Sequence, residues 1–169
     1  DVEDDEQIRQ LVESAVEHFG EIDFIVHSLA FAEQHDLTQP LDACSKDGFL
    51  RAMQISAYSL MRLIHWAKPH LSAEASIVTL TYLGARVAVP LYGVMGPVKA
   101  ALEAEVRCLA QDLGGRGVRV NAVSAGPIKT LAAAGLPGFR EKLREVGSQT
   151  ALGRGVTQTE VAHAVCFLC

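Results

Sequence analysis

The stretch from Ala75 to Gly126 decides the fold class: ASIVTLT at 75–81, GPVKAALEAEVRCLAQDLGGRG at 96–117 and VRVNAVSAG at 118–126. The first and third segments are short apolar runs without polar alternation, a pattern that is typical of strands buried on both faces. The middle segment has helical spacing and ends on a glycine-rich stop. A strand, a helix and a second strand in this order predict a parallel βαβ unit.

The same alternation continues on both sides of this unit. IDFIVHSLA, at 22–30, is a third apolar run and predicts another buried strand. Helical patterns stand at residues 5–19, 47–68 and 138–146, and a last one follows Thr157. We therefore predict an α/β protein in which helices cover both faces of a parallel sheet.

Length and composition exclude several classes of protein. The 169 residues suffice for one domain, with 49% hydrophobic and 21% charged residues. The net charge of −5 and the lack of a Lys/Arg-rich run argue against a nucleic-acid partner. No apolar run reaches the roughly 20 residues that span a bilayer, which argues against a membrane protein. The acidic opening DVEDDEQ and four scattered cysteines favour a cytoplasmic location.

The two ends of the chain suggest a partial sequence. The chain opens without Met on an acidic helix start and stops inside the helical pattern TEVAHAVCFLC. Three strands alone would leave sheet edges exposed. The first glycine is Gly20, so the glycine-rich turn that binds a dinucleotide pyrophosphate is expected upstream of Asp1. We expect that the N-terminal βαβαβ part and the C-terminal end of the fold are missing from this chain.

Two tyrosines and a lysine stand where a parallel sheet binds its ligands. Tyr82 directly follows the strand ASIVTLT, and such ligands lie at the carboxyl ends of the strands. Tyr92 and Lys99 are seven residues apart, about two helical turns, so a helix containing both would point them the same way. Pro97 is tolerated only in a first turn, which places the helix start near residues 93–94 and Tyr92 on the preceding turn.

This trio suits the chemistry of reduction. A phenol donates a hydrogen bond to a developing oxyanion, and a nearby ammonium is expected to lower the phenol pKa and to hold a ribose diol. The spacing alone also fits a half-buried tyrosine and a solvated lysine, because the two residue types co-occur by chance on many helices. The pattern by itself leaves both interpretations open.

A longer run, SIVTLTYLGA…VPLYGVMGPVKAALEAEVRCLAQDLGGRGVRVNAVSAGPIKTLAAAG, resembles the enoyl-[acyl-carrier-protein] reductases, a divergent branch of the short-chain dehydrogenases/reductases. DFIVHSLAFA, ISAYSL and GFREKLREV also fit, in the family's order. The family signature is tyrosine, six residues and lysine, with methionine three after the tyrosine, and Tyr92, Met95 and Lys99 fill it. Carbonyl-reducing members use Tyr-x-x-x-Lys instead, whereas Gly96 stands four residues after Tyr92.

The resemblance implies a Rossmann-like doubly wound fold and reduction of the 2,3 double bond of enoyl-acyl-carrier-protein thioesters in type II fatty-acid synthesis. The implied cofactor is NADH, with NADPH as the alternative. Tyr92 would donate to the thioester carbonyl, and Lys99 would hold the nicotinamide ribose. Tyr82 would line the pocket and assist protonation, while Ala30 and Met95 would contact the substrate.

The remaining cofactor contacts are also implied by the resemblance. They comprise an adenine-binding pair and the loops after two strands: Asp1, Val2, Ser28, Leu29, Ala30, Ala125, Gly126, Pro127, Ile128 and Thr130. Residues 131–147 would form a substrate lid within a single domain, 1–169. Two positions depart from the family pattern. Gly93 replaces a common asparagine and would add flexibility beside Tyr92, and Gln54 replaces a helix asparagine.

The resemblance also implies partners, namely enoyl-acyl-carrier protein and a homotetramer of this chain. The basic residues Lys129, Arg140, Lys142 and Arg144 form either a docking patch for the acidic carrier or a solvated lid face. The helices at 47–68 and 94–113 carry more apolar residues than one sheet face covers, which favours a symmetric helix interface. The alternative is an ordinary buried helix pair within one subunit.

Other signals favour structural roles. Cys166 and Cys169 form a CxxC in an apolar run without a second pair, so packing cysteines are favoured over a metal site. His27 ends a strand and is read as a hydrogen-bonded structural histidine. Two alternative functions remain open: a carbonyl-reducing short-chain dehydrogenase and a non-catalytic remnant of the fold.

Overall fold

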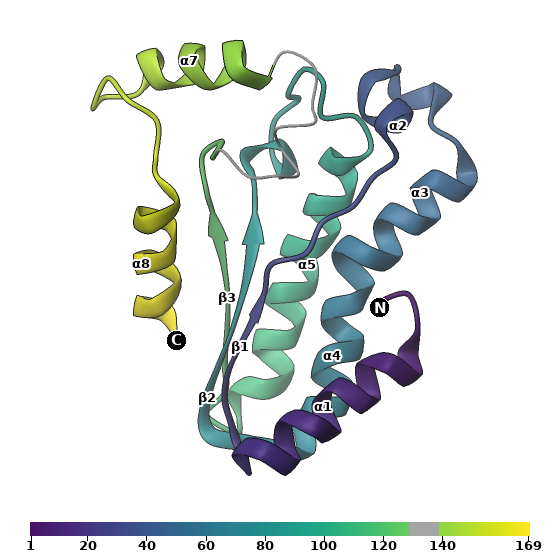
Figure 1. Ribbon diagram of the computed structural model, residues 1–169, viewed down its shortest axis with the longest axis vertical. Helices are drawn as coiled ribbons and strands as arrows, with labels where there is room; N and C mark the ends of the chain where they lie inside the picture. Colours follow the sequence, from purple (N-terminus) through teal and green to yellow (C-terminus); the bar gives the residue numbers. More distant parts are fainter. Residues whose placement is uncertain (129–138) are drawn as a thin grey trace.

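The chain folds into one parallel sheet with helices on both of its sides (Figure 1). The structure is a computed structural model that describes residues 1–128 and 139–169, with side chains of the helix at 139–149 described from residue 143 on. The helices are α1 (Asp5–Phe19), α2 (Gln34–Thr38), α3 (Lys46–Met53), α4 (Ser59–Ala67), α5 (Met95–Gly114), α7 (Phe139–Gln149) and α8 (Gln158–Leu168). The strands are β1 (Ile22–His27), β2 (Leu71–Thr81) and β3 (Arg119–Ser124).

The three described strands lie in the order β1-β2-β3 and are all parallel. Ile77 of β2 is in register with Ile25 of β1 and with Val120 of β3. The chain returns from β1 to β2 through α3 and α4, and from β2 to β3 through α5, because parallel strands require such crossovers. The predicted parallel α/β sheet is confirmed, and β2 begins at Leu71 rather than Ala75.

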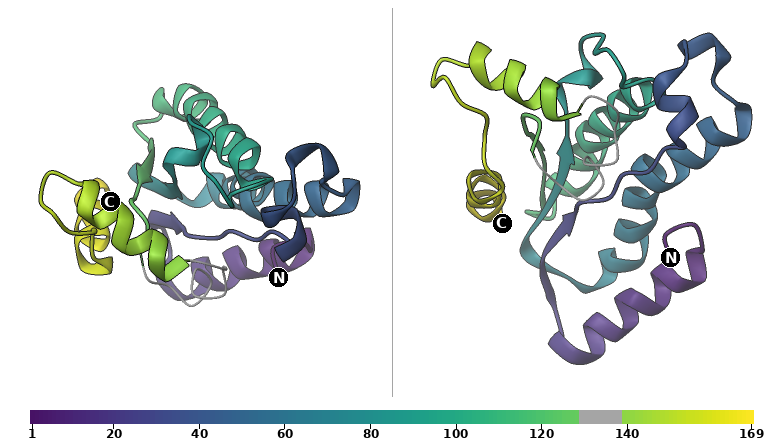
Figure 2. Two further views of the ribbon diagram at one scale, coloured as in Figure 1. Left: turned by 90° about the horizontal axis from the view of Figure 1, so that it is seen from above. Right: turned by 45° about the horizontal axis from the view of Figure 1, so that its top comes forward.

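The side of the sheet that faces α4 and α5 holds the main core (Figure 2). Buried residues from these two helices pack on the sheet there: Leu60, Ile64, Val98, Leu102 and Val106. The apolar faces of both helices are therefore used within one subunit. The predicted surplus of apolar helix surface stays a prediction, because Leu50 of α3 is 54% exposed although the side chains named above are covered.

The opposite side of the sheet is covered only in part. α8 lies across the strands from α4 and α5 (Figure 2), and the Ser76 hydroxyl of β2 donates to the Leu168 carbonyl oxygen at 2.5 Å. Val78 of β2 is fully buried, whereas Phe24 and Val26 of β1 are 59% and 43% exposed. The prediction of burial on both faces is right for β2 and wrong for β1, because α8 contacts β2 and β3.

Several helix ends form where the sequence places them. Asp4 caps α1 by accepting from the Glu6 amide at 2.9 Å, and Gly20 ends that helix with φ of 82°. Thr157 and Glu160 form a capping box at the start of α8, with each side chain accepting from the other residue's amide. These local signals need no tertiary partner, which is why the sequence reveals them.

The predicted helix at 47–68 is wrong in one respect. A π-turn, Gln54–Tyr58, separates α3 from α4. It widens the helix by one residue without ending it, and the apolar spacing on either side still looks helical. An inserted residue of this kind is hidden from an analysis of periodicity.

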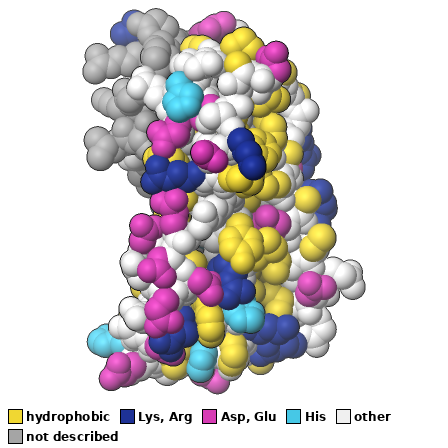
Figure 3. Space-filling model, turned by 90° about the vertical axis from the view of Figure 1, so that its right-hand side faces the viewer, with side chains coloured by type: hydrophobic (Ala, Val, Ile, Leu, Met, Phe, Trp, Pro, Cys, Tyr) yellow, Lys and Arg dark blue, Asp and Glu magenta, His cyan; other side chains and the backbone are white. Residues whose placement is uncertain are grey.

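Acidic, basic and hydrophobic side chains are interspersed on the face shown in Figure 3. Ion pairs join the N-terminal segment to α3 and α4: Arg51 Nε lies 2.9 Å from Glu3 Oε1, and Arg62 Nε lies 2.6 Å from Asp5 Oδ1. Exposed pairs of this kind contribute little to stability, because water and salt screen them. In the described part of the chain, no helix has both the length and the apolar character needed to cross a membrane.

Candidate active site

Two tyrosine rings meet at the carboxyl end of β2. Tyr82 directly follows the strand, as predicted, and its ring centroid lies 4.9 Å from that of Tyr92 in an edge-to-face arrangement. A 3₁₀ turn, Leu83–Ala85, follows Tyr82 and forms the surface under the second ring. A Cβ at Gly84 would overlap the Tyr92 ring, so the absence of a side chain there admits the ring.

Tyr92 stands on the turn before α5, as Pro97 predicts. The Met95 amide donates to the Tyr92 carbonyl oxygen at 3.0 Å, and α5 begins at Met95. Leu91, just before, has φ of 59°, a left-handed conformation that is uncommon for residues other than glycine. Because the regular helix starts after Tyr92, helical spacing does not set its direction relative to Lys99. The contacts of the turn do.

Gly93 has a role that the sequence did not indicate. Its φ is 40°, and a Cβ there would overlap the Asp36 carbonyl oxygen, which accepts from the Val94 amide at 3.2 Å. Asp36 itself is buried, and its carboxylate accepts from the Ser45 amide at 2.9 Å and hydroxyl at 3.1 Å. Gly93 therefore allows a close backbone contact. The expectation that it adds flexibility beside Tyr92 stays a prediction.

Lys99 is buried rather than solvated, with 6% of its surface exposed. Its Nζ donates to the Leu80 carbonyl oxygen at 2.7 Å, so the ammonium lies at the end of the same strand that precedes Tyr82. Burial lowers the pKa of Lys99 to about 8. The alternative of a solvated helix lysine is therefore wrong.

The phenol of Tyr92 is held in its protonated form. Burial, together with the Tyr82 phenol, raises the pKa of Tyr92 above its ordinary value, and burial also raises the pKa of Tyr82. The sequence led us to expect a lowered phenol pKa. The direction is the opposite, because desolvation of the phenolate dominates. Both phenols are thus hydrogen-bond donors at neutral pH.

His27 joins three elements beneath this site. Its Nδ1 lies 3.0 Å from Thr79 Oγ1 of β2, and its Nε2 lies 2.8 Å from Ser59 Oγ of α4. Burial, together with the charge of Lys99, lowers the pKa of His27 to about 4, so the ring is neutral at neutral pH. The predicted structural, hydrogen-bonded histidine is confirmed.

The π-turn supplies site residues that the sequence did not indicate. Ser56 Oγ accepts from the Phe31 amide at 2.8 Å and donates to the Phe31 carbonyl oxygen at 3.1 Å. These bonds fix the end of the loop that carries Ser28 and Ala30. π-turns are frequent at functional sites, but the only sequence signal here is a serine on an apolar helix face.

The residues predicted to hold a cofactor lie partly together. Ser28, Leu29 and Ala30 are exposed at the carboxyl end of β1. Ser28 and Leu29 line a cavity of about 260 Å³ together with Val2 from the start of the chain. Asp1 is exposed beside it. The fold thus brings Val2 of the predicted adenine-binding pair and Ser28 of the predicted loop over the cofactor to one cavity, although they lie far apart in the sequence.

The other predicted cofactor residues follow β3. Ala125, Pro127 and Ile128 are half-buried in the segment after Ser124, and Gly126 is exposed. Thr130 and Lys129 lie outside the described residues, as does the first part of the predicted lid, 131–138.

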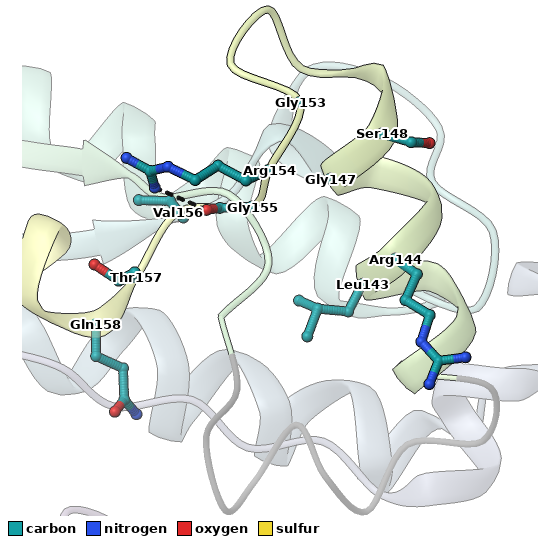
Figure 4. Close-up of a pocket in the computed structure, with 10 residues that line it drawn as sticks. All are labelled: Leu143, Arg144, Gly147, Ser148, Gly153, Arg154, Gly155, Val156, Thr157 and Gln158. Carbon is teal, nitrogen blue, oxygen red and sulfur yellow. Dashed lines mark hydrogen bonds between the residues drawn. The ribbon is translucent and has the colours of Figure 1, made fainter.

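The described part of the predicted lid lies in α7, which borders a cavity of about 620 Å³ (Figure 4). Leu143 of α7 points toward the segment that leads into α8, whereas the Arg144 side chain points away from that segment (Figure 4). Arg154 donates to the Gly155 carbonyl oxygen at 3.2 Å and to both carboxylate oxygens of Glu160, so its charge is already paired. The cavity is therefore bordered by the lid helix, and Arg144 is exposed at its rim.

A third cavity, of about 380 Å³, lies beside Tyr92. Its walls are mainly apolar and come from the segment after the 3₁₀ turn and from the start of α5, including Val87, Val89 and Gly96. Met95 is 5% exposed and packs in the main core, so its contact with an acyl chain stays a prediction. The sequence did not indicate Val87 and Val89 as cavity residues.

The cysteines do not pack as expected. Cys166 is exposed and Cys169 is half-buried at the end of α8, so the prediction of buried packing is wrong. The outward face of α8 is uncovered, with Phe167 87% exposed. Within the described ranges, no group of three or more His, Cys, Asp or Glu side chains is arranged to hold a metal ion.

The comparison with protein families decides the assignment. The family model described as enoyl-(acyl carrier protein) reductase matches residues 1–169. The chain belongs to this family. It is 45% identical over 167 residues to enoyl-[acyl-carrier-protein] reductase [NADH] FabI of Nostoc sp., and 45% identical over 168 residues to the [NADPH] FabI of Staphylococcus aureus.

Solved enoyl-acyl-carrier-protein reductases share the fold of this family member. The reductase of Aquifex aeolicus has a TM-score of 0.95 and 42% identity, with coverage of 100% of this chain and 66% of that one. The Bacillus cereus enzyme with NADP+ and indole naphthyridinone has a TM-score of 0.96 and 45% identity, with 99% and 65% covered. The chain also spans 65% of the length of the Nostoc relative and 66% of the Staphylococcus one.

Proposed function

We propose that the protein reduces the 2,3 double bond of enoyl-acyl-carrier-protein thioesters in type II fatty-acid synthesis, with NADH or NADPH as the reductant. One observation carries this proposal: in a member of this family, two protonated phenols and a buried ammonium meet at the carboxyl end of β2. Curated relatives are named as [NADH] and as [NADPH] enzymes, which supports a nicotinamide cofactor of either kind.

Tyr92 is the proposed hydrogen-bond donor to the thioester oxygen of the substrate. Its raised pKa keeps the phenol protonated, so it donates to the thioester oxygen as negative charge develops there. The bound nicotinamide supplies the hydride that reaches the β-carbon. The Tyr82 phenol, packed against the same ring, lines the pocket and assists protonation.

Lys99 is the proposed anchor for the nicotinamide ribose. An ammonium has three N–H donors, and among the described residues Lys99 Nζ makes one hydrogen bond, to the Leu80 carbonyl oxygen. A buried ammonium with donors to spare suits a ribose diol, so the residues present fit such a group.

The remaining cofactor contacts are proposed by residue type and position. Val2 and Asp1 hold the adenine, Ser28, Leu29 and Ala30 cover the cofactor, and Ala125, Gly126, Pro127, Ile128 and Thr130 contact the nicotinamide and the pyrophosphate. The shared cavity of Val2, Ser28 and Leu29 supports the first two groups. Ala30 and Met95 are the further proposed substrate contacts, and residues 131–147 are the proposed lid.

The proposed partners are enoyl-acyl-carrier protein and further copies of the same chain, in a homotetramer in the cytoplasm. Arg144 is exposed on the lid helix, which supports a contact with an acidic carrier. The tetramer rests on the family resemblance alone.

Reduction of a crotonyl thioester, measured against reduction of an acetoacetyl thioester, tests the function. We expect NADH or NADPH oxidation with the crotonyl thioester and none above background with the acetoacetyl thioester, because the chain lacks Tyr-x-x-x-Lys. The reverse result would establish the carbonyl-reducing alternative. Inactivity on both, by a folded full-length protein, would favour a non-catalytic remnant.

A further inference from the structure

Two successive turns of α5 hold the carboxyl end of β2. Lys99 Nζ donates to the Leu80 carbonyl oxygen at 2.7 Å, and one turn later Glu103 Oε1 accepts from the Thr81 hydroxyl at 3.0 Å. The two side chains lie on the same helix face because they are four residues apart. Thr81 is 6% exposed and the Glu103 side chain 11%, so this contact is shielded from water.

The same carboxylate also reaches the far side of the Tyr82 turn. Glu103 Oε2 lies 3.1 Å from Arg86 Nε. Thr81 and Arg86 flank the segment that carries Tyr82 and Gly84, and Gly84 is the residue whose missing side chain admits the Tyr92 ring. The Glu103 carboxylate thus contacts Thr81 and Arg86, the two residues that flank the turn on which the phenols meet.

We propose that Glu103 is a positioning residue, which fixes the Tyr82 turn and through it the Tyr92 phenol. The proposal rests on the proposed function of the site. Glu103 touches the turn and not the reacting atoms, so its loss misplaces the donors without removing them.

The two contacts of Glu103 differ in strength. The bond from Thr81 is buried and charge-assisted, which makes it the stronger kind. The partner of the second contact, Arg86, has a side chain that is 75% exposed, so water and salt screen that ion pair. Removing the Thr81 bond should therefore reproduce the loss of Glu103, and removing Arg86 should not.

Steady-state kinetics of the full-length protein on a crotonyl thioester test this order. We expect Glu103→Ala and Thr81→Val to lower kcat by about 10- to 100-fold, the range for a donor displaced by about 1 Å, with the KM for NADH within about twofold. Glu103→Gln keeps an oxygen acceptor for Thr81 and should retain most of the rate. Arg86→Ala should resemble the wild type.

NMR of ring-labelled tyrosine gives a readout that does not depend on activity. The 169 residues of this chain contain three tyrosines, and the third, Tyr58, lies in the π-turn and is 46% exposed. We expect Glu103→Ala to shift the Tyr82 and Tyr92 resonances and to leave that of Tyr58 in place. Unchanged Tyr82 and Tyr92 resonances in both Glu103→Ala and Thr81→Val would overturn the proposal, as would a wild-type kcat in both.

The experiments distinguish failure of the proposed function from failure of the proposed role of Glu103. An inactive wild type would refute the function, and the NMR comparison would still decide whether Glu103 positions the tyrosines. If Glu103→Ala does not fold, Thr81→Val decides, since it removes only the hydroxyl. An equal loss of rate in Arg86→Ala would overturn the claim that the Thr81 bond carries the effect.

Discussion

The carboxyl end of β2 and the outer side of β1 differ in how far contacts within the chain hold their side chains. At the carboxyl end of β2, Tyr82 and Tyr92 pack on each other, and Lys99 is held by a backbone carbonyl. On the outer side of β1, Phe24 and Val26 are largely exposed. A groove of about 520 Å³ runs along β1, lined by apolar residues of α1 and α4.

The comparison separates side chains whose positions are fixed by contacts within the chain from side chains that are exposed. Each group at the end of β2 has its position set by contacts within this chain, from α5, the 3₁₀ turn and the backbone of α2. The outer side of β1 has no such contacts among the described residues. Changes at the first region should therefore affect reaction rate or folding strongly, and changes at the second should affect either only weakly.

The largest effect is expected at Tyr92. Tyr92→Phe in the full-length protein should lower kcat by about 10²–10³, the cost of one oxyanion donor, with little change in cofactor affinity. Lys99→Ala should weaken cofactor binding as well as turnover. Tyr58→Phe, at an exposed position, is the matched control and should keep the wild-type rate. A fully active Tyr92→Phe would transfer the role of donor to Tyr82.

The next effect concerns the turn beneath Tyr92. Gly93→Ala should lower the free energy of unfolding by about 3 kcal/mol, because a Cβ is strained at a φ of 40° and overlaps the Asp36 carbonyl oxygen. Gly115→Ala is the control, since its φ is −62° and nothing lies within 4 Å. Urea unfolding measures both. Equal stability of the two variants would mean that the turn is not tightly packed.

Acidification should have opposite effects through the buried His27 and the half-buried Glu105 of α5. The pKa of His27 is lowered to about 4 from 6.5, so its stabilising contribution is lost as the pH falls from 6.5 to 4. The pKa of Glu105 is raised to about 7 from 4.5, and its contribution is lost as the pH rises from 4.5 to 7. In the wild type the two changes oppose each other between about pH 4.5 and 6.5.

Variants that lack one of the two groups should show the pH dependence of stability that the other group causes. Glu105→Gln should lose about 2–3 kcal/mol of unfolding free energy on acidification from pH 6.5 to 4.5, and His27→Asn should gain over the same range. Urea unfolding at three pH values measures these slopes. Parallel slopes in the two variants would contradict the burial assigned to these groups.

The smallest effect is expected on the outer side of β1. In the chain of residues 1–169, Phe24→Ser should change the free energy of unfolding by less than about 1 kcal/mol, because the ring is 59% exposed there. Ile25→Ser, one residue on and packed against the core, should cost about 2–3 kcal/mol. Chemical denaturation of the pair checks this. Similar losses for both would show that the outer side is covered in solution.

The sequence predicted the parallel sheet, the order of its elements and the start of α8 after Thr157, because apolar spacing and capping residues act locally. It also predicted Tyr82 at the end of β2 and Tyr92 on the turn before α5. It did not predict the π-turn, the role of Gly93, the direction of the Tyr92 pKa shift or the two contacts of Glu103. Each of these depends on atoms from segments distant in the chain.

What the sequence determined by itself is the family, the fold class and the residue types of the candidate site, because signature spacing and apolar periodicity are properties of the chain order. The tertiary structure alone decided that Lys99 is buried against Leu80 and that Tyr92 rests on Gly84. It also decided that β1 is covered on one face only. Burial, pKa and close backbone contacts arise from distant segments brought together, and no pattern along one segment records them.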